Sequence, residues 1–388
     1  MKITEEFKME QQLRTHTTQA EPAISMKDYG QVITGLINKQ DLDRDTAKDM
    51  FMEILTNRQT DMQQGAFLAA LSAKGETPAE VAASFEAIYE VDTKKVSPVT
   101  DGPVVENCGT GMDSFKTFNI STAAAVVAAA AGIPMAKHGS RALTSVCGTV
   151  DVLEAMGVDM DCDVDLVKQS IEEAGIGLFN GTSPKVHPMA LGRILSQISF
   201  GSVLNISASL ASPVLPEYAV RGVYSKDMLS FVPQIMKEIG YRRALVIYGE
   251  VGDQCIDEAS TLGTTWVAEL CPDGTVKEYS FSPADLGITP GDPDELRTLD
   301  SVDASALCLT RILLGRDTPT RTDAVALNAG LVLYLMDQAP TIREGYQKSL
   351  ELIHDGRAWA KMEDWVRTQN RDPEAGLARL KALQERVG

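Results

Sequence analysis

The sequence predicts an α/β protein with a small helical N-terminal domain and a larger α/β domain whose central sheet is mostly parallel. Three observations predict this fold class: amphipathic helical segments before residue 92, short apolar strands alternating with helices after residue 104, and a glycine-rich turn after the first strand. With 388 residues, 44% of them hydrophobic, the chain can bury a sizeable core. We expect a polar extension over 1–25, a helical domain over 26–97 and an α/β domain over 98–388.

The helical domain is predicted from four amphipathic segments, which read DYGQVITGLINK, DRDTAKDMFMEILTN, DMQQGAFLAALSAKG and PAEVAASFEAIYEVD. Each opens near Asp, Thr or Pro, which are residues that favour helix starts. The domain could serve only to pack, or it could also mediate oligomerisation, and the sequence leaves both open.

The α/β domain is predicted from the alternation that follows. Val104–Glu106 indicates a short buried strand, followed by the alanine-rich helix STAAAVVAAAAG, the strand PMAKHG, and the helices GTVDVLEAMG and DVDLVKQSIEEAG leading to IGLFN. Further elements are the strand RRALVIYG, a hairpin turning at Pro272–Gly274, the long buried helix DAVALNAGLVLYLMD and a helix in the tail from Pro373.

Charge and cysteine content exclude several classes of protein. The formal balance of 36 − 54 = −18 repels phosphate backbones, so nucleic acid is not expected as a general partner. The six cysteines form no CxxC pair, which favours reduced thiols. With no secretory signal and no apolar run of the roughly 18 residues that a membrane span needs, we expect a soluble cytoplasmic protein.

The stretch CGTGMDSFKTFNISTAAA, residues 108–125, favours an anion site. Gly109 and Gly111 allow a tight turn after a strand, and Asn119, Ser121 and Thr122 fall where the next helix begins. Backbone N–H groups and the positive helix end attract phosphate there, and hydroxyls such as that of Thr117 add donors. A turn and helix cap of purely structural use remains the alternative.

Two further stretches suit a phosphorylated ligand and a metal. In MAKHGSRALTSVCGTVDVLE, Lys137 and Arg141 flank Gly139, with hydroxyls at Ser140, Thr144 and Ser145, although a solvated loop would look the same. In YGEVGDQCIDEAST, Asp257 and Glu258 follow a strand and suit Mg²⁺ shared with substrate phosphates, although a DE pair often only begins a helix.

Together these motifs resemble the anthranilate phosphoribosyltransferase family, relatives of the pyrimidine nucleoside phosphorylases. The family's GTGGDxxxTFNIST loop matches Gly109–Thr122, its KHGNR loop matches Lys137–Arg141, and its DGxDE motif resembles Asp253–Glu258 with one inserted residue. The similarity extends in order over residues 26–370.

The resemblance implies a homodimer formed through the helical domain, with residues 185–215 returning to that domain and the substrate site between the two domains. It implies Mg²⁺ at Ser121, Asp257 and Glu258, and no covalent nucleophile. Phosphoribosyl pyrophosphate (PRPP) would contact Gly109, Thr110, Gly111, Met112, Asp113, Thr117, Asn119, Ser121, Thr122, Lys137, Gly139, Arg141, Ser145 and Thr149.

The predicted acceptor contacts are Ser140, His187, Arg193 and Gln197, and departures from the family pattern fall in this region. Ser140 replaces the asparagine of the KHGNR loop. Counting from His187 places Gln197 where the family carries the arginine that grips anthranilate, and Arg193 lies one helical turn away. Loss of a bidentate carboxylate contact costs roughly 1.5–3 kcal/mol. Met112 also replaces a glycine of the family loop, and FNLLGPLTNP becomes LNISASLASP.

We therefore predict a Mg²⁺-dependent phosphoribosyltransferase that joins PRPP to an aromatic or heterocyclic amine other than anthranilate. The alternatives are an anthranilate phosphoribosyltransferase of tryptophan biosynthesis, a nucleoside phosphorylase, and a non-catalytic homologue that binds nucleotides or nucleic acid.

Overall fold

The computed structural model describes residues 23–141 and 147–388, and its contacts divide the chain into two units. The first unit contains the chain up to Asp92 and the segment Pro188–Ala208, and the second contains Thr93–His187 and Ser209–Gly388. Of the extension predicted over 1–25, residues 1–22 lie outside the described residues.

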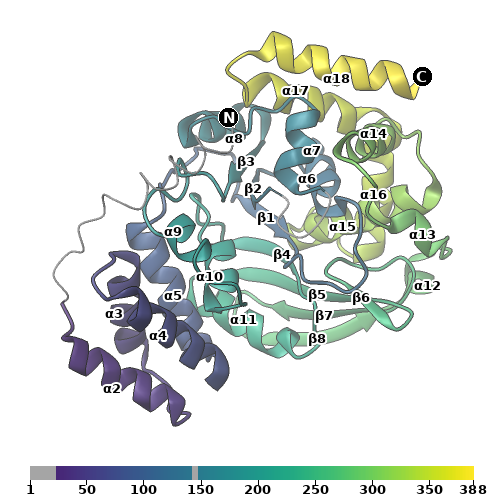
Figure 1. Cartoon of the computed structure of the whole chain (residues 1–388). Coiled ribbons are helices and arrows are strands. Elements are labelled where there is room, and N and C mark those ends of the chain that lie inside the picture. Colours follow the sequence, from purple (N-terminus) through teal and green to yellow (C-terminus); the bar gives the residue numbers. More distant parts are fainter. Residues whose placement is uncertain (1–22, 142–146) are drawn as a thin grey trace. The chain divides into compact units, whose positions relative to one another are not determined.

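The first unit is a helical bundle (Figure 1), and its helices start at side-chain caps. Ser25, Asp43, Thr60 and Thr77 each accept a hydrogen bond from a backbone N–H of the following first turn. The helices are α2 (Met26–Ile37), α3 (Arg44–Leu55), α4 (Asp61–Lys74), α5 (Pro78–Val91), α9 (Leu191–Leu195) and α10 (Val203–Leu210), the last of which leads back into the second unit.

The observed boundary between the units falls earlier in the chain than the 97/98 boundary expected from the sequence. Lys94 N donates to Val186 O at 2.9 Å and Val96 N donates to Pro213 O at 3.1 Å. These backbone bonds tie residues 93–97 to the second unit rather than to the bundle.

The second unit is built on an eight-stranded sheet in the order β3-β2-β1-β4-β5-β7-β8, with β6 paired to β5. The five strands from β3 to β5 in this order run parallel. β6 and β7 each pair antiparallel with β5, and β8 pairs antiparallel with β7, so the sheet is mostly parallel as predicted. The strands are β1 (Val105–Cys108), β2 (Met135–Gly139), β3 (Ile176–Asn180), β4 (Tyr218–Gly222), β5 (Arg243–Val251), β6 (Gln254–Ile256), β7 (Thr265–Leu270) and β8 (Val276–Phe281).

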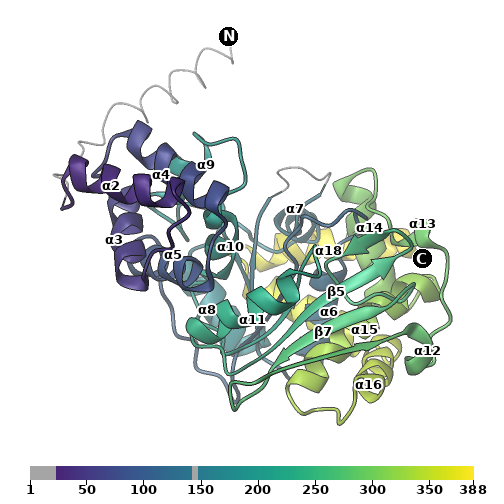
Figure 2. The same ribbon diagram turned by 90° about the horizontal axis from the view of Figure 1, so that it is seen from below.

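Helices cover both faces of this sheet, and the alternation of strand residues shows which helices lie on which face. Met135 of β2 joins the large core, whereas its neighbour Ala136 packs with Val167 and Ile171 in a smaller cluster. The helices, several of them labelled in Figure 2, are α6 (Ile120–Ala130), α7 (Thr149–Ala155), α8 (Val164–Ala174), α11 (Met228–Glu238), α12 (Pro283–Leu286), α13 (Pro293–Leu296), α14 (Val302–Leu313), α15 (Pro319–Leu335), α16 (Ile342–His354), α17 (Arg357–Thr368) and α18 (Pro373–Val387).

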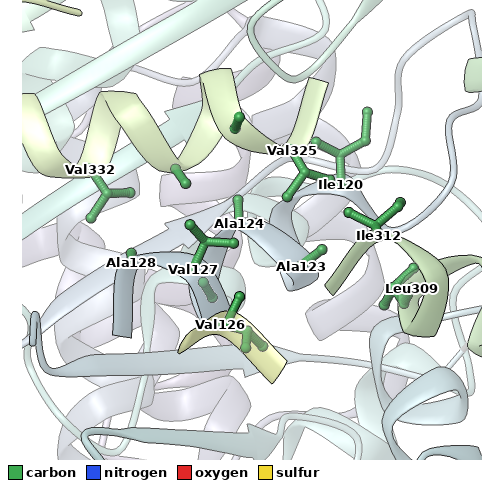
Figure 3. Packing of buried hydrophobic residues seen from close by; sticks show 14 of the residues in the cluster. Ile120, Ala123, Ala124, Val126, Val127, Ala128, Leu309, Ile312, Val325 and Val332 are labelled. Carbon is green, nitrogen blue, oxygen red and sulfur yellow. The ribbon is translucent and has the colours of Figure 1, made fainter. Parts of the chain in front are cut away.

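The large core is assembled around the alanine-rich helix α6. Small side chains on α6 let α14 and α15 approach closely, so that Val127 packs among residues such as Leu309 and Val325 (Figure 3). An equally close approach joins α15 to α16, where a Cβ on Gly330 would lie 2.5 Å from Tyr346 N. This packing fixes α6, and with it the loop that precedes α6. Among the described residues, no helix is long and apolar enough to cross a bilayer.

Candidate active site

The glycine loop joins β1 to α6 and lies against the segment that follows β6. Gly111 adopts a positive φ of 70°, and its N–H donates to Asp257 Oδ2 at 2.5 Å. Thr110 Oγ1 donates to the same oxygen at 3.2 Å. Met112 is 56% exposed, and it is not among the described non-glycine residues with positive φ, so its backbone is compatible with a side chain at a position where the family carries glycine.

Two glycines make room for Asp257. A Cβ on Gly109 would lie 2.4 Å from Asp257 Cγ, and one on Gly222 of β4 would lie 1.5 Å from the Asp257 carbonyl oxygen. Side chains at these positions would push Asp257 away from the loop. Glycine in the β1 loop and at the end of β4 therefore sets the position of this carboxylate.

Three buried carboxylates meet at the loop. Ligand oxygens of Asp113, Asp257 and Glu258 lie within 4.8 Å of one another. Burial, and then the charge of Asp257, raise the pKa of Asp113 to about 6. Burial, and then the charges of Asp257 and Asp113, raise the pKa of Glu258 well above its ordinary value.

This trio fits a divalent cation. Carboxylate oxygens are the ligands that Mg²⁺ prefers. The pKa values of Asp113 and Glu258 are raised by burial and by neighbouring carboxylate charge, and a bound cation would offset both effects. The sequence prediction named Asp257 and Glu258 for the metal and assigned Asp113 to PRPP. The structure brings Asp113 to the same point, whereas Ser121, also predicted for the metal, is seen accepting hydrogen bonds through its carbonyl oxygen from Asn107 and Lys137.

A buried side-chain amide binds the backbone of the segment that carries Asp257 and Glu258. Asn328 of α15 accepts a hydrogen bond from Ala259 N at 2.9 Å and donates to Ala259 O at 3.1 Å. Because Ala259 directly follows Glu258, these hydrogen bonds let α15 fix the backbone of the carboxylate pair. Sequence reasoning missed this role, although a lone asparagine inside the apolar run of the LNAG helix was the available signal.

The predicted loop cations Lys137 and Arg141 have partners within the protein. Lys137 is 2% exposed and donates to Asn107 O at 2.6 Å and Asn107 Oδ1 at 2.9 Å. Burial lowers the pKa of Lys137 to about 8. Arg141 pairs with Glu154 at 2.7 Å and with Asp151 at 3.3 Å.

Other predicted PRPP contacts fall around the first turns of α6 and α7. Asn119 precedes α6 and forms no side-chain cap, and Thr117 Oγ1 donates to Glu258 Oε2 at 3.5 Å. Thr122 Oγ1 donates to Thr149 Oγ1 of α7 at 3.4 Å. Gly139 ends β2 nearby, and a Cβ on it would lie 3.3 Å from Thr149 Cβ. Ser145 lies outside the described residues.

Two histidines face each other in the α/β unit. His138 Nε2 and His187 Nε2 lie 3.4 Å apart, and Thr93 Oγ1 lies 3.5 Å from His187 Nδ1. Burial, and then His187, lower the pKa of His138 to about 3, so this ring is neutral at neutral pH. Ser140, predicted with His187 to contact the acceptor, is exposed.

The other predicted acceptor residues belong to the helical unit. Arg193 of α9 donates to Gln64 Oε1 at 3.1 Å and to Ile54 O at 2.6 Å, so its guanidinium holds the bundle together. Gln197 follows α9 and is exposed. Arg193 therefore gives no sign of replacing the arginine expected at position 197.

Family models match the two units in turn. A glycosyl transferase family helical bundle domain matches residues 30–91, and a glycosyl transferase family a/b domain matches residues 101–359. The fold and the loop-bound carboxylates thus place the protein among two-domain glycosyl transferases, and within that class it is a phosphoribosyltransferase.

The chain belongs to the anthranilate phosphoribosyltransferase family. It is 35% identical to the anthranilate phosphoribosyltransferase of Methanocorpusculum labreanum over 86% of this chain and 96% of that protein, and 36% identical to that of a Roseiflexus species over 85% and 95%. The crystal structure of the Thermus thermophilus enzyme superposes with a TM-score of 0.77 at 29% identity, covering 87% of this chain and 98% of that one.

These relatives support the family and the fold expected from the sequence. They do not support the preference for an acceptor other than anthranilate, because they are named as anthranilate phosphoribosyltransferases. The alternative that kept anthranilate as acceptor fits them better.

Proposed function

We propose that this protein transfers a phosphoribosyl group from PRPP to anthranilate with the help of Mg²⁺. The observation that carries the proposal is the trio Asp113, Asp257 and Glu258 held against the glycine loop, in a chain that matches anthranilate phosphoribosyltransferases over nearly their whole length. A structure of the Saccharomyces cerevisiae enzyme in complex with PRPP and Mg, which shares the fold at a TM-score of 0.76 and 22% identity, supports the same pair of ligands.

The chain's own groups suit a pyrophosphate leaving group. The glycine loop and the uncapped start of α6 offer backbone N–H donors, and the hydroxyls of Thr117 and Ser121 lie in the same segment. Asp113, Asp257 and Glu258 would hold the metal. When bound, Mg²⁺ neutralises charge on the departing pyrophosphate. By holding the pyrophosphate, the loop's donors orient the bond that breaks toward an acceptor, so that direct transfer needs no covalent nucleophile.

Two residues of the helical unit support a second candidate acceptor, an aromatic or heterocyclic amine that has no carboxylate. Gln197 is neutral and exposed, and the guanidinium of Arg193 is bonded to Gln64 and Ile54. An aromatic or heterocyclic amine without a carboxylate would lose nothing from these differences, whereas anthranilate would lose a charge-assisted contact. We expect anthranilate turnover with a raised KM.

The experiment that tests the proposal follows anthranilate consumption in the presence of PRPP and Mg²⁺. Formation of N-phosphoribosyl anthranilate with one pyrophosphate per turnover is the expected result. Pyrophosphate release with another aromatic amine, and none with anthranilate, would favour the second candidate. Failure to bind PRPP at all would overturn the proposal.

The cytoplasmic location and the homodimer remain predictions. Light scattering on the purified protein checks the dimer, and a mass of twice 41.9 kDa is expected.

A further inference from the structure

Lys116 places a positive charge on the glycine loop, and it is not among the residues that the sequence predicts to bind PRPP or Mg²⁺. Its Nζ donates to Gly111 O at 2.8 Å and to Asp113 Oδ1 at 3.0 Å. The side chain is 42% exposed, whereas that of Asp113 is 5% exposed. The ammonium group thus closes the loop and neutralises one member of the carboxylate trio from the solvent side.

The backbone around Lys116 is held firmly on both sides. Phe115 is buried, and its N–H donates to Cys255 O at 2.9 Å. The carbonyl of Lys116 accepts from Thr298 N at 2.9 Å, and Thr117 forms a β-bridge with Arg297. A flexible four-carbon stem on a fixed backbone can move its charge without rearranging the loop.

A divalent cation at the trio would compete with the ammonium group for Asp113. Both positive charges would lie within a few ångströms of one carboxylate, and the metal carries the larger charge. The displaced ammonium would remain over the glycine loop, beside the N–H groups that suit pyrophosphate. The buried Lys137 and the acid-paired Arg141 have partners that such a metal would leave in place.

We propose that Lys116 is a positioning residue that holds Asp113 and the glycine loop in the metal-free protein and passes to the pyrophosphate when Mg²⁺ binds. This inference rests on the proposed PRPP and Mg²⁺ site. It assigns opposite effects to one side chain: competition with the metal and attraction of the phosphates.

The test compares Lys116→Met, Lys116→Arg and the control Lys381→Met, an exposed lysine of α18, by calorimetry. Lys116→Met should bind Mg²⁺ alone about two- to fivefold more tightly, since the half-exposed ammonium group no longer competes for Asp113. At saturating Mg²⁺ it should bind PRPP about ten- to a hundredfold more weakly, as expected for loss of a charge-assisted contact. Lys116→Arg should restore most of the PRPP affinity, and Lys381→Met should match the parent protein for both ligands.

If Lys116 only stabilises the loop, Lys116→Met should weaken the binding of Mg²⁺ and of PRPP together, and that result would overturn the inference. So would affinities equal to those of Lys381→Met. If the parent protein binds no PRPP, the proposed function fails and the inference falls with it, whereas normal binding by parent and variant alike sinks the inference alone.

Discussion

At the scale of single residues, the charge of the Asp113 carboxyl group depends on burial and on its neighbours. Burial and Asp257 raise its pKa to about 6, above its ordinary value of 3.8. Because the folded-state pKa is higher than the unfolded one, the folded protein binds more protons between about pH 4 and 6. Without metal, stability therefore decreases as the pH rises through this window, and Mg²⁺ should restore it.

Asp113→Asn removes this repulsion. The variant should melt a few degrees higher than the parent at pH 7.5 in EDTA, because the relief of repulsion exceeds the roughly 0.2–1 kcal/mol contributed by the partly exposed ion pair with Lys116 that is lost. It should also gain less stability from added Mg²⁺. Melting curves with EDTA and with Mg²⁺ check both points. An equal or lower melting temperature of the variant in EDTA would show that the charge of Asp113 does not destabilise the metal-free protein.

Gly222 can be tested at the same scale. A Cβ there would lie 1.5 Å from the Asp257 carbonyl oxygen, so Gly222→Ala must displace Asp257, one of the proposed metal ligands. We expect a loss of about 2–4 kcal/mol in unfolding free energy, together with weaker Mg²⁺ binding. Gly65→Ala in α4 is the matched control, since no atom lies within 4 Å of its added Cβ, and it should be neutral or slightly stabilising. Equal behaviour of the two variants would refute the packing argument.

At the scale of elements, α15 links the core to the site. Asn328→Leu leaves the N–H and C=O of Ala259 without their partners, at a cost of roughly 1–3 kcal/mol for each buried group. Denaturant unfolding should show this loss, and calorimetry should show weaker Mg²⁺ binding, whereas the exposed Asn38→Ala should change neither. If the Asn328→Leu variant is destabilised but binds Mg²⁺ normally, the claim that α15 positions the carboxylate segment is wrong.

Elements with a clear pattern of apolar residues could be predicted from the sequence, whereas β4 could not. The hairpin of β7 and β8, the strands β2 and β5 and the helices α6 and α15 follow from apolar runs and turn residues. β4 contains Arg221, which interrupts its apolar pattern yet is 2% exposed. Its guanidinium donates to Cys108 Sγ at 2.9 Å and to Ser209, and these are partners that only the tertiary structure supplies.

The candidate site shows the same division. The glycine loop and the Asp257–Glu258 pair were predictable, because local sequence places donors and carboxylates at strand ends. The inclusion of Asp113 in the trio depends on how the loop folds back toward β6. The internal pairing of Lys137 depends on Asn107 of the neighbouring strand, which sequence spacing does not reveal.

At the scale of the whole molecule, the proposed function requires a chain of net charge −18 to bind an anionic donor. Long-range repulsion therefore has to be offset locally, by the loop's N–H groups, by Lys116 and by a metal on the carboxylate trio. PRPP binding should therefore depend strongly on Mg²⁺, since without metal the trio adds further negative charge at the site.

The most direct test is a calorimetric titration of PRPP into the protein with saturating Mg²⁺ and with EDTA, repeated with Asp257→Asn and Glu258→Gln. We expect one PRPP per chain with Mg²⁺, and binding at least about tenfold weaker in EDTA and in both variants. PRPP affinity that is unchanged by EDTA and by both substitutions would contradict it.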